Sequence, residues 1–122
     1  MKLINYKNNV YSQNGEDGII HAIFASLKEK VSDNKWCVEF GAWDGKYLSN
    51  TFNLVEQGWN AVYIEGDAEK YKDLLITVEA YPKIIPLLGM VDFDKESQNS
   101  LDNLLARTIL PSDYELLSID ID

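Results

Sequence analysis

The chain has 122 residues, of which 46% are hydrophobic and 25% are charged, and it contains a single cysteine. This composition is typical of one soluble globular domain, and it excludes disordered, collagen-like and disulfide-stabilised proteins. The 11 basic and 20 acidic residues give a net charge of −9, so we expect no nucleic-acid or membrane binding through a basic patch. With no long apolar run and no signal-peptide core, we expect a cytoplasmic protein.

Hydrophobic periodicity predicts helices that alternate with strands after a polar arm over residues 1–11. Apolar residues at helical spacing predict a first helix from Glu16 to Val31, and continuous apolar runs predict buried strands. We expect Gly58 to end the second helix. The remaining predicted elements are strands at Trp36–Phe40, Ala61–Glu65, Ile84–Val91 and Leu116–Ile119, and helices at Ser49–Gln57, Ala68–Ala80 and Glu96–Arg107.

This alternation predicts a single domain over residues 1–122 with an α/β fold. It is a Rossmann-like three-layer sandwich with a parallel sheet and helices on both faces. Pro86 lies inside the third predicted strand and cannot donate a ladder hydrogen bond, so that strand should lie at an edge. The order 3-2-1-4 meets this requirement and places the switch point between strands 1 and 4. Ligands of such sheets bind outside the carboxyl ends of the strands at this point.

The segment 39–45 after the first strand contains two glycines, Gly41 and Gly45, that suit a tight turn. A P-loop is excluded, because only three residues separate the glycines and Tyr47 follows Lys46. The bulky Trp43 disfavours a nicotinamide-dependent oxidoreductase, whose turn needs a glycine to admit the pyrophosphate. Two interpretations remain: a turn that binds a nucleoside without phosphates, and a plain strand-to-helix connection.

Acidic residues follow all four predicted strands. Glu65 is placed to accept hydrogen bonds from both hydroxyls of a ribose, and Asp92 could bind an adenine amino group. Asp67 is either a further ligand or the N-cap of the next helix. We interpret these acids as one site that attracts a cation, because carboxylates at a buried edge are costly to desolvate. The acids at or just beyond the strand ends are Glu39, Asp44, Glu65, Asp67, Asp92, Asp94, Asp120 and Asp122.

Several of these segments together resemble a known enzyme family. Val38–Gly45 is similar to motif I of class I S-adenosylmethionine-dependent methyltransferases, and Tyr63–Asp67 is similar to their acidic second motif. Tyr11–Gly18 and Leu48–Thr51 more specifically resemble bacterial FkbM-like methyltransferases. The resemblance covers nearly the whole chain from Tyr11 onward. It implies that S-adenosylmethionine is the cofactor and that a hydroxyl of a small molecule or sugar accepts the methyl group.

The resemblance also implies roles for individual residues. Glu39 and the turn after it would hold the methionine part of the cofactor, and Trp43 or Tyr47 could contact its cation. Asp120 would be the catalytic residue that faces the methyl group or the acceptor. Asp120 and Asp122 could instead bind Mg²⁺, and a simple terminal position is equally compatible with the sequence. The implied cofactor-binding residues are Glu39, Gly41, Ala42, Gly45, Glu65, Gly66, Asp92 and Phe93.

A second class of function is a non-catalytic Rossmann-like binding or interaction module that kept the fold without the chemistry. The family that the chain resembles has seven strands, so four predicted strands suggest a cofactor-binding part truncated after strand 4. The exposed edge of that strand then favours a homodimer. One histidine and one cysteine are too few ligands for a zinc site, and no second histidine exists for Ser-His-Asp or Cys-His catalysis. We expect Cys37 to be buried as a small apolar residue.

Overall fold

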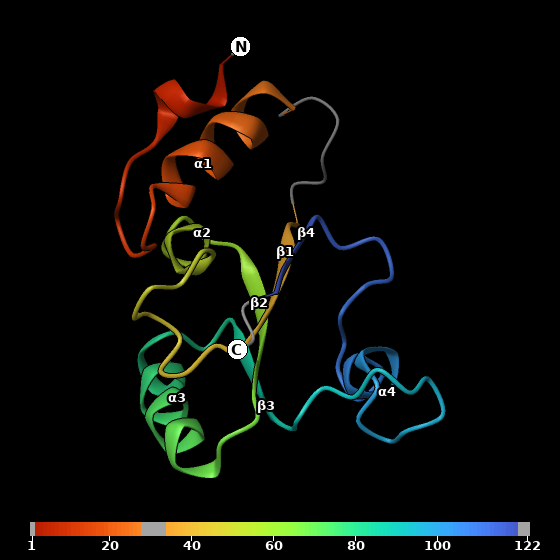
Figure 1. Ribbon diagram of the computed structural model, residues 1–122. Coiled ribbons are helices and arrows are strands. Elements are labelled where there is room, and N and C mark those ends of the chain that lie inside the picture. Colours follow the sequence, from red (N-terminus) through yellow and green to blue (C-terminus); the bar gives the residue numbers. More distant parts are fainter. Residues whose placement is uncertain (1, 28–33, 120–122) are drawn as a thin grey trace.

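A parallel four-stranded sheet organises the described part of the chain, residues 2–27 and 34–119 of the computed structural model (Figure 1). The strand order is β3-β2-β1-β4, and every described pair is parallel, which confirms the predicted α/β Rossmann-like arrangement. In chain order the elements are η1 (Leu3–Tyr6), α1 (Glu16–Ser26), β1 (Trp36–Phe40), α2 (Phe52–Glu56), β2 (Asn60–Glu65), α3 (Ala68–Ala80), β3 (Ile84–Leu88), α4 (Leu101–Leu105) and β4 (Leu116–Ile119).

The strand that contains Pro86 lies at one edge of this sheet, as the missing N–H of proline predicted. Pro86 is in register with Tyr63 of β2. β4 lies at the opposite edge of the described sheet and pairs with β1, where Cys37 is in register with Leu116. The homodimer through the β4 edge stays a prediction.

Alternating residues of the two central strands build a separate core on each face of the sheet. Tyr63 of β2 packs on one face with Phe52 of α2 and Leu74 of α3. Val38 of β1 packs on the other face with Leu104 of α4. Figure 1 shows α1, α2 and α3 on one side of the sheet and α4 on the other. Burial of an aliphatic or aromatic side chain contributes about 1.5–3 kcal/mol, so these two cores hold the central strands in place.

Two helices and one strand are shorter than the sequence predicted. α4 begins at Leu101 and not at Glu96, because Asp94 and Ser97 accept backbone N–H groups of their near neighbours and form turns instead of helix. α2 begins at Phe52 and not at Ser49. The helix of residues 52–56 is followed by Gly58 at a φ of 98°, which confirms the predicted glycine stop.

β3 ends at Leu88 rather than at Val91, and Gly89 then donates its N–H to the Glu65 carbonyl. The described part of α1 ends at Ser26, and the predicted end at Val31 lies outside the described residues. Residues 3–6 of the predicted polar arm form the short helix η1.

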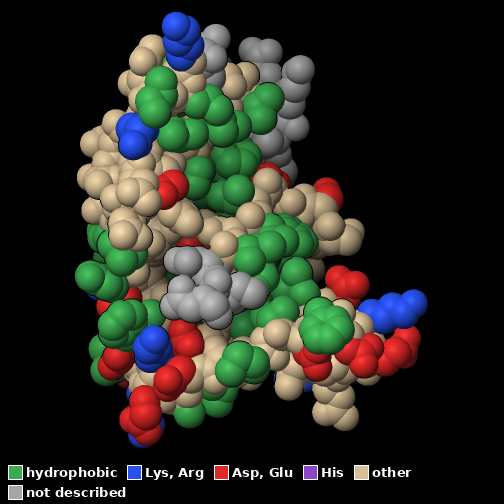
Figure 2. Space-filling view, viewed as in Figure 1, with side chains coloured by type: hydrophobic (Ala, Val, Ile, Leu, Met, Phe, Trp, Pro, Cys, Tyr) green, Lys and Arg blue, Asp and Glu red, His purple; other side chains and the backbone are tan. Residues whose placement is uncertain are grey.

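The surface carries both groups of apolar side chains and groups of acidic side chains. On the face shown in Figure 2, hydrophobic side chains gather beside α4 and over α1, and acidic side chains lie near both α3 and α4. The large apolar residues Met90, Phe93 and Ile109 are exposed. In the described ranges, no helix has the length and apolar character that crossing a membrane requires.

The buried position of Cys37 leads to a chemical prediction. Its side chain is fully buried, and this burial raises the pKa of the thiol well above its usual range. We expect Ellman's reagent at mildly alkaline pH to react with the native protein far more slowly than with free cysteine. In concentrated urea the same thiol should react at the rate of free cysteine. Because the chain has one cysteine, rapid labelling of the native protein would contradict the buried position.

Candidate functional site

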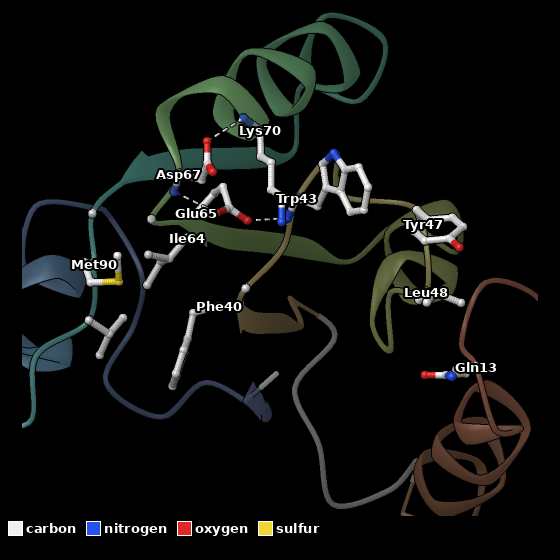
Figure 3. A pocket seen from close by; sticks show the side chains of 14 residues that line it. Gln13, Phe40, Trp43, Tyr47, Leu48, Ile64, Glu65, Asp67, Lys70 and Met90 are labelled. Carbon is white, nitrogen blue, oxygen red and sulfur yellow. Dashed lines mark hydrogen bonds between the residues drawn. The ribbon is translucent and has the colours of Figure 1, made fainter. Parts of the chain in front are cut away.

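A cavity of about 430 Å³ opens at the carboxyl ends of β1 and β2 (Figure 3). Phe40 and Ile64 form apolar walls from the two strand ends, and Met90 and Val91 add a third wall after β3. No described residue of β4 lines the cavity. The described cavity therefore lies over β1, β2 and the segment after β3, displaced from the predicted switch point between strands 1 and 4.

Glu65 places a carboxylate in the lining of this cavity. The residue is 7% exposed, and its two oxygens accept the N–H groups of Trp43 and Asp67, each at 2.8 Å (Figure 3). The carboxylate thereby connects the turn after β1 to the turn after β2. Each carboxylate oxygen has two lone pairs, so both oxygens can accept one further hydrogen bond from a ligand hydroxyl.

The turn after β1 uses its own N–H groups internally. Gly41 and Ala42 both donate to the Ile64 carbonyl, at 3.0 and 3.2 Å, and Gly45 donates to the Ala42 carbonyl. Gly41 has a φ of 77° and lines the cavity, so it lets a ligand approach the backbone. A ligand beside this turn would find open space and the carboxylate of Glu65. The N–H groups of Gly41 and Gly45 already donate to carbonyl groups of the protein.

Ala42 and Gly45 lie beneath the turn and do not line the cavity. Ala42 is 2% exposed, and a Cβ at Gly45 would lie 3.1 Å from Leu74 and 3.2 Å from Tyr63. Both residues therefore shape the turn by packing against the core. Gly66, in contrast, lines the cavity, where a Cβ would come within 3.3 Å of the Met90 sulfur.

Trp43 adopts a φ of 51°, a conformation that costs a non-glycine residue about 1–3 kcal/mol. Its indole N–H donates to Asp73 at 3.2 Å, and the Lys70 ammonium lies 4.9 Å from the ring centroid. Tyr47 makes an edge contact with the same ring at 5.4 Å. These contacts stabilise the turn. The cation that contacts the Trp43 ring is therefore the ammonium group of Lys70, a residue of the protein itself.

Glu39 is buried at 2% exposure and does not line the described cavity. Its Oε1 atom accepts the Asn50 N–H at 3.0 Å and lies 3.3 Å from the Ser49 hydroxyl and 3.2 Å from the Thr51 hydroxyl. The Thr51 hydroxyl also lies 2.8 Å from that of Tyr63, a phenol whose pKa burial raises well above its usual value. Glu39 thus fixes the segment 49–51 over the end of β1.

Two residues after β3 that the resemblance implies for adenine binding, Asp92 and Phe93, do not lie in the cavity lining. Asp92 accepts the Asp94 N–H at 3.1 Å, and Phe93 is fully exposed. Neither residue lines the cavity, whereas Met90 and Val91 do. An adenine ring in this cavity would accordingly contact Met90 and Val91, of which Val91 is also part of the adenine site that the resemblance implies.

The acids at the strand ends do not gather in one place. Of those described, Glu65 and Asp67 line the cavity. Asp67 is the N-cap of α3 and accepts the N–H groups of Glu69 and Lys70, so the helix-capping interpretation is confirmed. Asp44, Asp92 and Asp94 each accept the N–H of a residue two positions later in the chain. The inference of one cation-attracting cluster is therefore wrong for the described acids, because their carboxylates serve local turns and caps.

Two further lining residues escaped the sequence analysis. Lys70 is the one basic side chain among the described residues around this cavity, and Gln13 reaches it from the arm before α1. The position of Lys70 could have been found, because it follows the Asp67 cap by three residues in the first turn of α3. Gln13 lies within Tyr11–Gly18, a segment that carries the family resemblance, but the resemblance implies no cofactor-binding role for Gln13.

The implied catalytic residue Asp120 and the candidate Mg²⁺ ligand Asp122 lie outside the described residues. Within residues 2–27 and 34–119, no group of three or more His, Cys, Asp or Glu side chains could hold a metal ion. The cavity volume lies within the range of about 300–1,000 Å³ that is usual for small-molecule sites. A buried carboxylate between apolar walls fits the ribose and base of a nucleoside. Comparisons with known protein families, curated proteins and solved structures found no match.

The contacts of Glu39 predict a structural role that can be measured. Glu39→Ala leaves the Asn50 N–H and two hydroxyls without their common acceptor. We expect the free energy of unfolding in urea to fall by about 1–3 kcal/mol. Glu39→Gln keeps an oxygen at this position and should retain most of the stability. Equal stability of the alanine variant and the wild-type protein would contradict this role.

Proposed function

We propose that this protein is an S-adenosylmethionine-dependent methyltransferase whose cofactor binds in the cavity at the ends of β1 and β2. The observation that supports it most is the position of Glu65. This buried carboxylate follows the second parallel strand and lies beside a glycine turn after the first, among apolar walls. A carboxylate in this position can hold both ribose hydroxyls of a nucleoside.

The polar groups of the cavity suit the cofactor better than a dinucleotide. The turn after β1 has no free N–H at Gly41, Ala42 or Trp43 for a pyrophosphate, because all three groups are bonded to β2 residues. A nucleoside needs only the hydroxyl contacts to Glu65 and the apolar contacts to Met90 and Val91. When bound, the cofactor would supply an activated methyl group, to which an acceptor oxygen bonds as the carbon–sulfur bond breaks, with release of S-adenosylhomocysteine and a proton. We propose a small-molecule or sugar hydroxyl as the acceptor.

The alternative is a non-catalytic nucleoside-binding or interaction module on the same fold. The observation that favours it is the local role of the strand-end acids, which accept backbone N–H groups and leave no described general base at the cavity besides Glu65 and Asp67. The two functions differ in outcome: a module binds the cofactor without transferring its methyl group to any acceptor, even as the whole protein.

Calorimetric titration with S-adenosylhomocysteine tests the proposed site. We expect wild-type protein to bind this ligand and Glu65→Gln to bind it at least about tenfold more weakly, since a hydrogen bond to a charged group contributes about 1.5–3 kcal/mol. Glu79→Gln is the matched control, because Glu79 is exposed on α3 and lies outside the cavity lining.

A change in the ligand separates ribose binding from protein stability. Adenosine should bind the wild-type protein more tightly than 2′,3′-dideoxyadenosine, and Glu65→Gln should reduce this preference. Wild-type protein that binds neither S-adenosylhomocysteine nor adenosine would overturn the proposed function. Tight binding of NADH in its place would favour an oxidoreductase.

A further inference from the structure

The segment from Tyr11 to Gly18 is organised around the buried carboxylate of Asp17. Asp17 is 2% exposed, and its Oδ2 atom accepts the N–H groups of Val10, Tyr11 and Ser12 at 2.8, 2.7 and 2.8 Å. The Asp17 N–H donates in return to the Ser12 hydroxyl at 3.2 Å. The backbone immediately before residue 13 is therefore held at three successive N–H groups.

Two glycines allow the arm to lie closely against α1. Gly15 has a φ of 85°, and a Cβ there would lie 2.6 Å from the Lys7 Cβ. A Cβ at Gly18 would lie 1.9 Å from the Tyr6 carbonyl oxygen, a distance that no side chain tolerates. Residues at these two positions must therefore lack a side chain for the loop to keep its path.

Tyr11 attaches the same loop to the helices over the sheet. Its ring makes an edge contact with Phe52 of α2, with 4.8 Å between ring centroids. Its phenol donates to the Glu56 carboxylate, and this hydrogen bond raises the pKa of Tyr11 to about 12. The loop is thus fixed both to α1 and to α2.

The residue that this framework presents to the cavity is Gln13. Its side chain is exposed and makes no hydrogen bond within the described residues, yet it lines the cavity. Figure 3 shows the carboxamide pointing away from the arm toward the cavity. Gln13 and Met90 lie at opposite ends of the view, with Glu65 and Phe40 between them. A nucleoside held by Glu65 and Met90 would extend its 5′ substituent toward Gln13.

The described residues that line the cavity near Gln13 carry no formal charge. Tyr47 and Leu48 line it beside Gln13, whereas the charged lining residues lie at the end of β2 and the start of α3: Glu65, the N-cap Asp67 and Lys70 (Figure 3). A carboxamide donates two hydrogen bonds and accepts at its oxygen, so it can bind a carboxylate and an ammonium group at once. A zwitterion with no net charge fits such an end better than a phosphate does.

We propose that Gln13 binds the amino-acid end of a nucleoside ligand in this cavity, a role that rests on the proposed function. The arm before α1 then forms a further wall of the binding site, and Asp17 positions it. The ligand class that satisfies both ends is an adenosine that carries a zwitterionic amino acid at its 5′ position.

Two ligands that differ only at this end test the role of Gln13. S-adenosylhomocysteine carries the amino acid, and 5′-methylthioadenosine carries the same adenosine and sulfur without it. In calorimetric titrations we expect Gln13→Ala to weaken S-adenosylhomocysteine binding about 5- to 10-fold, the loss of one hydrogen bond between protein and ligand. Its affinity for 5′-methylthioadenosine should change less than about twofold. Glu65→Gln should weaken both ligands.

The outcomes separate this role from the proposed function. Gln13→Ala should unfold at the wild-type temperature, because the side chain is exposed and unbonded. Asp17→Asn, which weakens the support of the loop, should show the same selective loss for S-adenosylhomocysteine. Equal effects of Gln13→Ala on the two ligands, or no effect on either, would overturn the role of Gln13 and leave the cavity as a nucleoside site. Wild-type protein that binds neither ligand would overturn both proposals.

Discussion

The structure depends on buried carboxylates that accept backbone N–H groups. Asp17, Glu39 and Glu65 are the buried acids of the described residues, with exposures of 2%, 2% and 7%. Removing a carboxylate from water costs several kcal/mol unless it is well bonded. Each of these three accepts at least one backbone N–H group at 3.0 Å or less, and hydrogen bonds to a charged acceptor are about twice as strong as neutral ones. The loops that surround the cavity are fixed by these bonds.

This constraint changes the meaning of the acidic composition. The net charge of −9 does not identify a single cation-binding cluster, because the described strand-end acids outside the cavity complete turns and loops. The cavity itself has a more balanced lining, with Glu65, Asp67 and Lys70 close to α3. A ligand with hydroxyl groups and an aromatic base suits this lining better than a strong cation does. The sulfonium of the proposed cofactor would be held in place by the contacts of its ribose and base more than by attraction to a net negative charge.

The four strands were predictable because each is a short, largely apolar run, and the sheet buries its central strands β1 and β2 along nearly their whole length. The order was predictable because Pro86 requires an edge position for its strand and because crossovers between parallel strands are right-handed. The ends of α2 and α4 were not predictable from periodicity. Residues 49–51 bind Glu39, a partner distant in the sequence, and Asp94 and Ser97 bond their near neighbours. Periodicity detects which side chains face a core, and it does not detect which backbone groups a distant carboxylate holds.

The same limit explains the partial success at the site. Of the implied cofactor-binding residues, Gly41, Glu65 and Gly66 line the cavity, because the ends of the buried strands β1 and β2 fix their positions. Gly45 and Ala42 do not line it, because both pack beneath the turn against the core. Gln13 was missed because it lies about 50 residues before Glu65 and reaches the cavity only through the tertiary contacts of Tyr11 and Asp17.

Pro86 also determines which edge of the sheet is better suited to pair with a further strand. Ala61 donates to the Lys83 carbonyl and Gly89 donates to the Glu65 carbonyl, so the odd-numbered residues of this segment face β2 and Pro86 faces outward. A strand that paired with the outer side of β3 would lack one hydrogen-bond donor, because Pro86 in the middle of β3 has no N–H group. Leu116 and Ser118 of β4 carry N–H groups at the opposite edge, since Glu115 faces β1 through its bond to the Trp36 carbonyl. Any strand added to this sheet, from this or another chain, would therefore make its full set of hydrogen bonds beside β4.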